Sequence, residues 1–243
     1  MMKMTRTDFF KFVVDIFLPN RCAVCSKVIR WDREMCRSCA EKIERVADSV
    51  CPVCAKKQCL DHASLRFDRA VCIYSYEEPC ITGIYQLKFA RTVSFAKHSA
   101  GELAKVLERR GLAQQIDVVT CVPMSRRKKR KRGHNHAEVI ANYLAKQLGK
   151  PLDVSLLVHS NTMTDHHKLL GSERAENARN SFAIAQKHGD ISGKTVLLCD
   201  DVYTTGATMN ACADCLKRLG AKSVIAAAIA TTQRERKRES QQI

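Results

Sequence analysis

The stretch VLLCDDVYTTGAT, residues 196–208, joins an apolar run to two carboxylates and a loop rich in hydrogen-bond donors. An apolar run entering such a loop is typical of a parallel strand in an α/β protein, whose carboxyl end presents a phosphate-binding loop. Gly206 permits a backbone conformation that other residues rarely adopt. The donors are the hydroxyls of Thr204, Thr205 and Thr208 and the amides from Thr205 to Thr208. Since Asp200 and Asp201 are acceptors suited to ribose hydroxyls, the stretch predicts a phosphosugar site.

A purely structural interpretation of this stretch makes the two carboxylates helix caps and Gly206 a turn residue. Adjacent carboxylates at the end of a buried strand repel one another and gain little from a cap, so we favour the site. Upstream, GDISGKT at 189–195 places only three residues between its two glycines. A nucleotide-binding P-loop needs four there and leads out of a strand rather than into one, so we reject that interpretation.

Composition predicts one α/β domain with a small additional module in this chain of 243 residues, of which 45% are hydrophobic. Lys and Arg total 41 against 25 Asp and Glu, a formal net charge of +16. Seven basic residues are consecutive: Arg126, Arg127, Lys128, Lys129, Arg130, Lys131 and Arg132. This basic segment favours phosphates, nucleic acid or an anionic surface as partners, and its alternative is a solvated loop that aids solubility.

The N-terminal residues 1–19 predict an amphipathic helix rather than a signal peptide. Lys11 and Asp15 interrupt the apolar run, and polar residues recur at helical spacing on one face. Packing against the protein is the favoured role and attachment to a membrane surface the alternative. No stretch has the ~18 uninterrupted apolar residues of a transmembrane segment, and we predict a cytoplasmic protein.

Thirteen cysteines are present, and seven of them lie within residues 22–59. Together with His62 they form two sets of four candidate ligands, which we call the first cluster (Cys22, Cys25, Cys36 and Cys39) and the second cluster (Cys51, Cys54, Cys59 and His62). Paired C-x2-C turns supply the four ligands of a closed structural zinc site, so the spacing predicts two zinc ions with a folding role. Disulfides are the alternative, and the two sets could also interleave.

Apolar runs and helical patterns alternate along the rest of the chain. Strands are predicted at 70–76, 117–122, 195–200 and 223–230, and helices near 80–90, 95–109, 136–148, 173–180 and 207–219. This alternation predicts a parallel sheet flanked by helices. Because loops at the carboxyl ends of parallel strands converge, we expect the basic segment, as a loop, to lie near the acidic pair.

Residues 196–208 resemble the phosphoribosyl pyrophosphate (PRPP) motif of type I phosphoribosyltransferases, without a gap. The wider order of cysteine pairs, YSYEEPCITGIYQLKF at 74–89, CVPMSRRKKRKRGHNHAEVIA at 121–141 and ERAENARNSF at 173–182 resembles the ComF family of competence-associated proteins. This resemblance implies a type I phosphoribosyltransferase fold with a zinc module and a role in natural transformation, through machinery that handles single-stranded DNA. It implies four parts: the helix 1–19, a Cys-rich module 20–66, a phosphoribosyltransferase-like domain 67–232 and a basic tail 233–243.

The resemblance also assigns roles to residues. PRPP with Mg²⁺ would bind at Asp200, Asp201, Thr204, Thr205, Gly206, Ala207 and Thr208. The favoured catalytic cations are Lys88, Arg132 and Arg174, with Arg126 and Arg127 as further candidates. Residues 159–172 lie where a closing lid would sit. Two glutamines of the family are histidines here, His136 and His166, which puts the acceptor preference in doubt. With His134 and His167 we interpret them as solvated loop histidines, and the alternative is that they gather at one site as acid, base or ligand.

The sequence is compatible with three functions. The first is a ComF-like transferase, with competence-machinery proteins as partners, and the second is an ordinary nucleobase-salvage phosphoribosyltransferase. The third is a binding module with a vestigial PRPP pocket, which contacts DNA or proteins through the basic segment and the cysteine turns. Basic residues of the tail would join that contact: Arg234, Arg236, Lys237 and Arg238. With 6% aromatic residues, such a module would bind single-stranded DNA mainly through phosphates.

Overall fold

The computed structural model describes residues 19–57, 59, 62–89, 93–160 and 181–233. Its centre is a four-stranded parallel sheet in the order β1 (Arg69–Ser75), β6 (Ser223–Thr231), β5 (Thr195–Tyr203) and β2 (Val118–Cys121). β6 is buried along almost its whole length, which explains its continuous run of apolar residues. The predicted parallel α/β sheet is confirmed.

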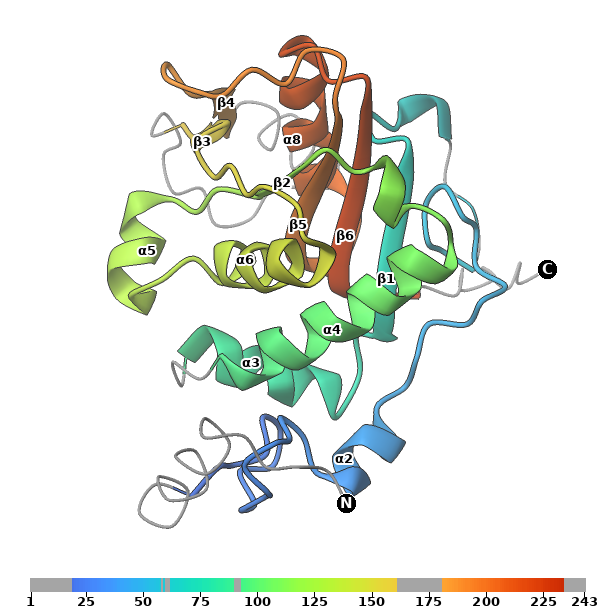
Figure 1. Cartoon of the computed structure of the whole chain (residues 1–243), viewed down its shortest axis with the longest axis vertical. Coiled ribbons are helices and arrows are strands. Elements are labelled where there is room, and N and C mark those ends of the chain that lie inside the picture. The colour runs from blue at the N-terminus through green and yellow to red at the C-terminus, as the bar shows by residue number, and fades with distance from the viewer. Residues whose placement is uncertain (1–18, 58, 60–61, 90–92, 161–180, 234–243) are drawn as a thin grey trace, which may run out of the picture.

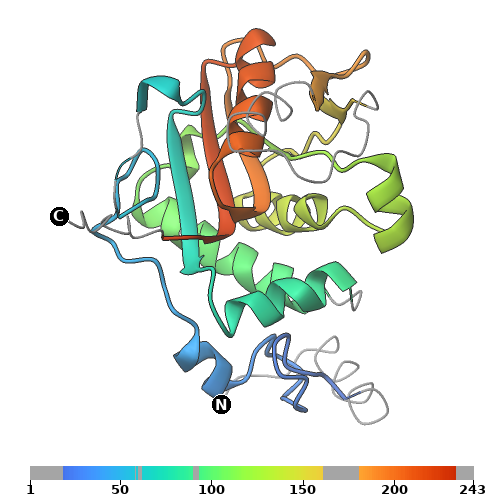
Figure 2. The same cartoon turned by 180° about the vertical axis from the view of Figure 1, so that it is seen from behind.

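Helices cover both faces of the sheet (Figures 1 and 2). α3 (Cys80–Phe89) and α4 (Ser94–Arg109) follow β1, and α6 (His136–Leu148) follows β2 and packs beside α4. α8 (Ala207–Arg218) connects β5 to β6. The connection from β1 to β2 and the connection from β5 to β6 run in opposite directions across the sheet. Because both are right-handed, their helices lie on opposite faces, with α8 on one face and α4 and α6 on the other.

A second, small sheet pairs β3 (Leu157–His159) with β4 (Phe182–Ile184) in antiparallel fashion, and β4 contacts α8. The short helical turn η2 (Ala113–Gln115) precedes β2. Among the described helices, none is both long enough and apolar enough to cross a bilayer.

The Cys-rich module contains α2 (Arg37–Lys42) and the helical turn η1 (His62–Ser64). Its first half packs on α4, where Glu34 lies 2.5 Å from Lys97 Nζ and Arg45 lies 2.6 Å from Glu102. Its second half lies against β5, β6 and α8, because Lys56 and Ser64 contact residues there. Between these halves, Arg45 forms an antiparallel bridge with Tyr74 of β1, and the amide of Val46 donates to the carbonyl of Ile73 at 2.9 Å. The module is therefore attached to the sheet domain on α4, along β1 and at the ends of β5 and β6.

Two predictions about elements are corrected by the structure. The basic segment is not a loop but a helix, α5 (Arg126–Arg132). Ser125 accepts a hydrogen bond from the amide of Lys128, Gly133 ends the helix at φ 83°, and Lys and Arg are good helix formers. The strand predicted to end at Asp200 continues to Tyr203, so the acidic pair lies within β5. The predicted helices 1–19 and 173–180 lie wholly or almost wholly outside the described residues.

Candidate functional site

Residues 204–208 comprise the turn after β5 and the first two residues of α8, and are called the phosphate loop below. Gly206 adopts φ 82°, and a β-carbon there would lie 2.6 Å from a ring carbon of Tyr203. The amide of Ala207, the first residue of α8, donates to the hydroxyl of Thr205 at 3.4 Å. Because the loop leads into the N-terminus of a helix at the carboxyl end of a parallel strand, its geometry suits an anion.

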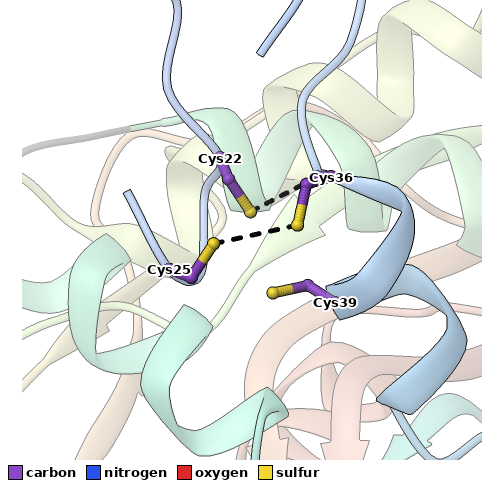
Figure 3. A group of neighbouring side chains, drawn as sticks. All are labelled: Cys22, Cys25, Cys36 and Cys39. Atoms are coloured by element: carbon purple, nitrogen blue, oxygen red, sulfur yellow. Dashed lines mark hydrogen bonds between the residues drawn. The ribbon is translucent and has the colours of Figure 1, made fainter. Parts of the chain in front are cut away.

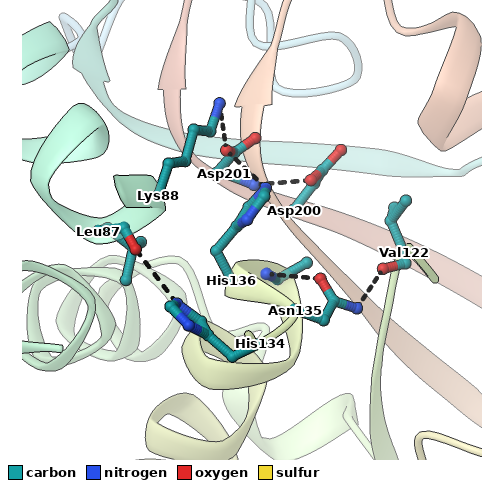
Figure 4. A network of polar contacts seen from close by, with 9 residues as sticks. Leu87, Lys88, Val122, His134, Asn135, His136, Asp200 and Asp201 are labelled. Atoms are coloured by element: carbon teal, nitrogen blue, oxygen red, sulfur yellow. Dashed lines mark hydrogen bonds and ion pairs between the residues drawn. The ribbon is translucent and has the colours of Figure 1, made fainter. Parts of the chain in front are cut away.

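The acidic pair precedes this loop within β5 and divides into two environments (Figure 4). Asp201 is 6% exposed, and its Oδ2 lies 2.6 Å from Lys88 Nζ and 3.2 Å from His136 Nε2. Asp200 is partly exposed and accepts a hydrogen bond from the amide of Asp201 at 2.9 Å. The pair therefore combines a carboxylate held by two basic groups with one beside it that lacks these contacts.

The two carboxyls differ in pKa for this reason. Burial would raise the pKa of Asp201, but the contact with His136 and the charge of Lys88 hold it well below its ordinary value. Although Asp200 as a residue is partly exposed, desolvation of its carboxyl raises its pKa above the ordinary value, and the neighbouring charge of Asp201 adds to this rise. Asp201 is thus the ionised member, and Asp200 holds its proton more tightly than a free aspartate does.

A turn before α6 brings these groups together. Asn135 caps α6 by accepting from the amide of Ala137 at 3.1 Å, and its side-chain amide donates to the carbonyl of Val122 at 3.0 Å (Figure 4). His134 Nε2 donates to the carbonyl of Leu87 at 3.2 Å, next to Lys88. The turn therefore connects the end of β2, the end of α3 and β5.

Two histidines in this turn differ from their predicted state. His136 is not a solvated loop residue: it is 6% exposed and is the first residue of α6, which directs it at Asp201. His134 is half-buried against α3. The sequence indicated the helix start at His136, since Asn before the apolar pattern of 136–148 marks one, but it gave no signal of the contact with Asp201.

The predicted cations occupy different places. Lys88 contacts Asp201 of the acidic pair. The guanidinium carbon of Arg132 lies 5.1 Å from the ring centre of Phe89 instead. The other six residues of α5 are exposed, and Lys129 lies 3.4 Å from Glu138. Arg174, His166, His167, the lid at 161–172 and the tail residues Arg234, Arg236, Lys237 and Arg238 lie outside the described residues.

A cavity of about 630 Å³ lies between the start of α5, the start of α6 and the small sheet. Its lining includes Arg126, Lys129, Glu138, Leu157, His159 and Ile184. It thus has basic, acidic and apolar walls at the carboxyl end of β2, and two residues of the basic segment face it. Neither β3 nor β4 was predicted, because strands of three residues carry too little periodicity to recognise.

The two predicted metal clusters are assembled, each with four ligand atoms within 4.8 Å of one another. In the first cluster the Sγ atoms of Cys25 and Cys36 are 3.7 Å apart (Figure 3), and in the second Cys51 Sγ lies 3.5 Å from His62 Nε2. All thirteen cysteines are free thiols, and the two sets are sequential, not interleaved. Burial opposes ionisation of Cys22 and Cys51, but backbone amides that bond their sulfurs lower the pKa of each thiol to about 7. Four such donors at this spacing fit a tetrahedral zinc ion.

Comparison with known proteins agrees with both parts of the chain. Residues 96–243 match the family model described as the phosphoribosyl transferase domain. The chain belongs to this family. Residues 13–73 match the model of the double zinc ribbon domain.

Curated relatives are similar to this chain over most of its length. The DNA utilization protein YhgH of Escherichia coli K12 is 29% identical over 84% of this chain and 86% of its own. The competence protein ComFC of Bacillus subtilis is 22% identical over 79% and 82%. A purine phosphoribosyltransferase structure from Pyrococcus horikoshii covers 55% of this chain and 70% of its own, at 24% identity and a TM-score of 0.34. The resemblance to the ComF family is thus confirmed.

Proposed function

We propose that this protein binds PRPP with Mg²⁺ at the phosphate loop and acts in the handling of single-stranded DNA during natural transformation. Membership of the phosphoribosyl transferase domain family supports the ligand. The names of the relatives, a DNA utilization protein and a competence protein, support the process. An ordinary nucleobase-salvage role is less favoured, because base recognition does not need the double zinc ribbon.

The observation that carries the PRPP site is the buried contact of Lys88 and His136 with Asp201, directly before the phosphate loop. In this proposal the 5′-phosphate lies at Thr204–Thr208, where amides and hydroxyls donate to it. The ribose hydroxyls lie at Asp200 and Asp201. Mg²⁺, which prefers oxygen ligands and few of them from protein, would neutralise the pyrophosphate.

Lys88 is the cation best placed for the leaving group. Departure of pyrophosphate from the ribose leaves an electron-poor centre, so the protein's task is to stabilise developing negative charge and to position the acceptor. The ammonium of Lys88 lies at the ribose end of the site through its contact with Asp201. Arg132 lies on Phe89 beside it, and we assign it the outer edge of the site. The acceptor would enter the cavity lined by Arg126, Lys129 and Glu138.

Ligand-induced thermal stabilisation tests the site. We expect PRPP with Mg²⁺ to raise the melting temperature of the wild type, and Asp200→Asn combined with Asp201→Asn to abolish that rise relative to the variant's own melting temperature. Glu108→Gln, the same chemical change at an exposed position on α4, is the matched control and should keep the full rise. An equal rise in the double variant would refute the assignment.

The DNA role is supported by the surface beside this site. Six residues of α5 are exposed and basic, and Tyr85 and Phe89 of α3 form an exposed aromatic pair whose ring centres are 4.6 Å apart. Arg132 connects the two surfaces through its contact with Phe89. Phosphates on α5 and bases stacked on the aromatic pair would suit a single strand.

Replacing Arg126–Lys131 by glutamine, while Arg132 is kept, should weaken binding of a single-stranded oligonucleotide and flatten its dependence on salt. The control replaces exposed basic residues of another region, Lys105 and Arg109 on α4. If fluorescence anisotropy gives the same affinity and salt slope for the α5 variant and the control, α5 does not bind DNA.

A further inference from the structure

Lys56, in the second half of the Cys-rich module, is a buried lysine that reaches the phosphate loop. Its side chain is 7% exposed, and its ammonium lies 4.3 Å from the ring centre of Tyr203. Its three N–H groups lie within hydrogen-bond distance of four oxygens: the carbonyls of Tyr203 at 3.3 Å, Thr204 at 2.8 Å and Thr232 at 2.8 Å, and the hydroxyl of Thr231 at 2.7 Å. One side chain thus joins the ends of β5 and β6 at the point where the phosphate loop begins.

The position of Lys56 is set by the second cluster. The amide of Cys51 donates to the carbonyl of Lys56 at 3.0 Å, and the amide of Ala55 donates to the carbonyl of Cys51 at 2.8 Å. Gln233, just after β6, accepts from the amide of Lys57 at 2.9 Å and donates to the carbonyl of Ala55 at 3.1 Å. The turn that carries Cys51 and Cys54 is therefore the turn that holds Lys56.

The same half of the module also holds the other end of the phosphate loop. Asn210 lies in the first turn of α8, and its side-chain amide donates to the carbonyl of Ser64 at 3.0 Å. Its side-chain oxygen accepts from the amide of Arg66. Ser64 follows His62, the last ligand of the second cluster. The module therefore contacts the chain on both sides of residues 205–208.

Peptide geometry gives these contacts a consequence for anion binding. The peptides after Tyr203 and Thr204 are trans, so each carbonyl points away from the next amide. Because Lys56 holds both carbonyls on one side, the amides of Thr204 and Thr205 face the opposite side. The positive charge of Lys56 also lies behind these two peptides and favours an anion in front of them.

We propose that Lys56 is a positioning residue through which the second cluster holds the phosphate loop in its anion-binding conformation; this rests on the proposed PRPP site. Packing alone would not favour a lysine here, since burying an ammonium is costly unless its hydrogen bonds are used. An apolar side chain of similar length would fill the space at lower cost. The loop conformation thereby depends on the integrity of the second cluster.

The test compares Lys56→Met with Lys57→Met, the same change at the adjacent, exposed residue. The first measurement is amide hydrogen exchange of the ligand-free proteins, detected by mass spectrometry. We expect faster exchange in Lys56→Met confined to peptides that contain residues 203–210, with no change in Lys57→Met. A role limited to global stability would instead raise exchange throughout β5 and β6. The second measurement is calorimetric titration with PRPP and Mg²⁺. We expect Lys56→Met to bind PRPP at least about tenfold more weakly than the wild type, which corresponds to a loss of about 1.4 kcal/mol in binding free energy.

The two readouts separate the proposals. If the wild type does not bind PRPP, the proposed function fails, while the exchange comparison still tests Lys56. Equal exchange at 203–210 in the two variants would overturn the role of Lys56. Should Lys56→Met not fold, Cys59→Ser serves instead, because Cys59 is an exposed ligand of the second cluster. It should lose one zinc per chain and show the same faster exchange, and unchanged exchange despite the lost metal would refute the coupling.

Discussion

The contrast between Asp200 and Asp201 gives the sharpest test of the site's electrostatics. Asp201 is buried, with Lys88 Nζ at 2.6 Å and His136 Nε2 at 3.2 Å from its Oδ2. Asp201→Asn keeps the shape but removes the charge that both groups contact. Removing one partner of a buried ion pair costs about 3–5 kcal/mol. Since the new amide oxygen can still accept from Lys88, the lower end applies, about 3 kcal/mol, or roughly 6–12 °C in melting temperature for a chain of this size.

Asp200→Asn is the matched variant, and its expected result differs in sign. The pKa of Asp200 is raised, so folding favours its neutral form, and an amide imitates that form without repelling Asp201. We expect unchanged or increased stability at neutral pH. The melting temperatures of both variants are measured by scanning calorimetry in the absence of Mg²⁺ and PRPP. Equal losses in the two variants, or a larger loss in Asp200→Asn, would refute the assigned charge states.

The pH dependence provides an independent check. The pKa of Asp201 is lowered in the folded protein, so its ionised form stabilises the fold above its ordinary pKa, and this contribution is lost as pH falls through the folded pKa. The difference in stability between wild type and Asp201→Asn should therefore be complete at neutral pH and shrink below about pH 4. A difference that stays constant down to the acid transition would mean that the lost stability is not electrostatic.

Three further outcomes follow from individual groups. Elemental analysis of freshly purified protein should find two zinc ions per chain and Cys36→Ser should retain one, whereas one or none in the wild type would contradict the double cluster. Gly206→Ala should lower the free energy of unfolding by about 1–2 kcal/mol because of the positive φ, and by more if the Tyr203 ring cannot move. The same substitution should weaken PRPP binding, and an unchanged affinity would contradict the role of this loop. Because the pKa of Asp200 is raised, binding of PRPP with Mg²⁺ should weaken as pH falls, as measured by calorimetric titration, and Asp200→Asn should show less of that dependence.

The features predicted from the sequence are those that local patterns encode. The four parallel strands follow from continuous apolar runs, and both metal clusters follow from the spacing of their cysteines. The phosphate loop is equally local, since Gly206 with positive φ and the helix start at Ala207 lie within one short motif. The basic segment was wrongly assigned to a loop because its charge was given more weight than its caps, Ser125 and Gly133.

The missed features depend on contacts between distant parts of the chain. His136 faces Asp201 only because α6 packs against β5, and its position is not visible in a motif that covers either segment alone. Lys56 and Thr204 are 148 positions apart in sequence, and a lysine beside a cysteine turn gives no signal that it is buried. Likewise the sequence ranks Arg132 with Lys88, and only the structure separates the two, since Arg132 lies on Phe89 whereas Lys88 contacts Asp201.

The attachment of the Cys-rich module changes what the predicted boundary between 20–66 and 67–232 means. Its first half contacts α4 through Glu34 and Arg45, whereas its second half supplies Lys56 to the ends of β5 and β6. A fragment that begins at residue 67 would keep every residue of the PRPP motif but leave the carbonyls of Tyr203 and Thr204 without the ammonium that orients them. We therefore expect such a fragment to bind PRPP more weakly than the full chain. By the same contacts, a partner that displaces the turn at Ala55–Lys57 would act directly on the phosphate loop, so the zinc module and the ligand site form one structural unit.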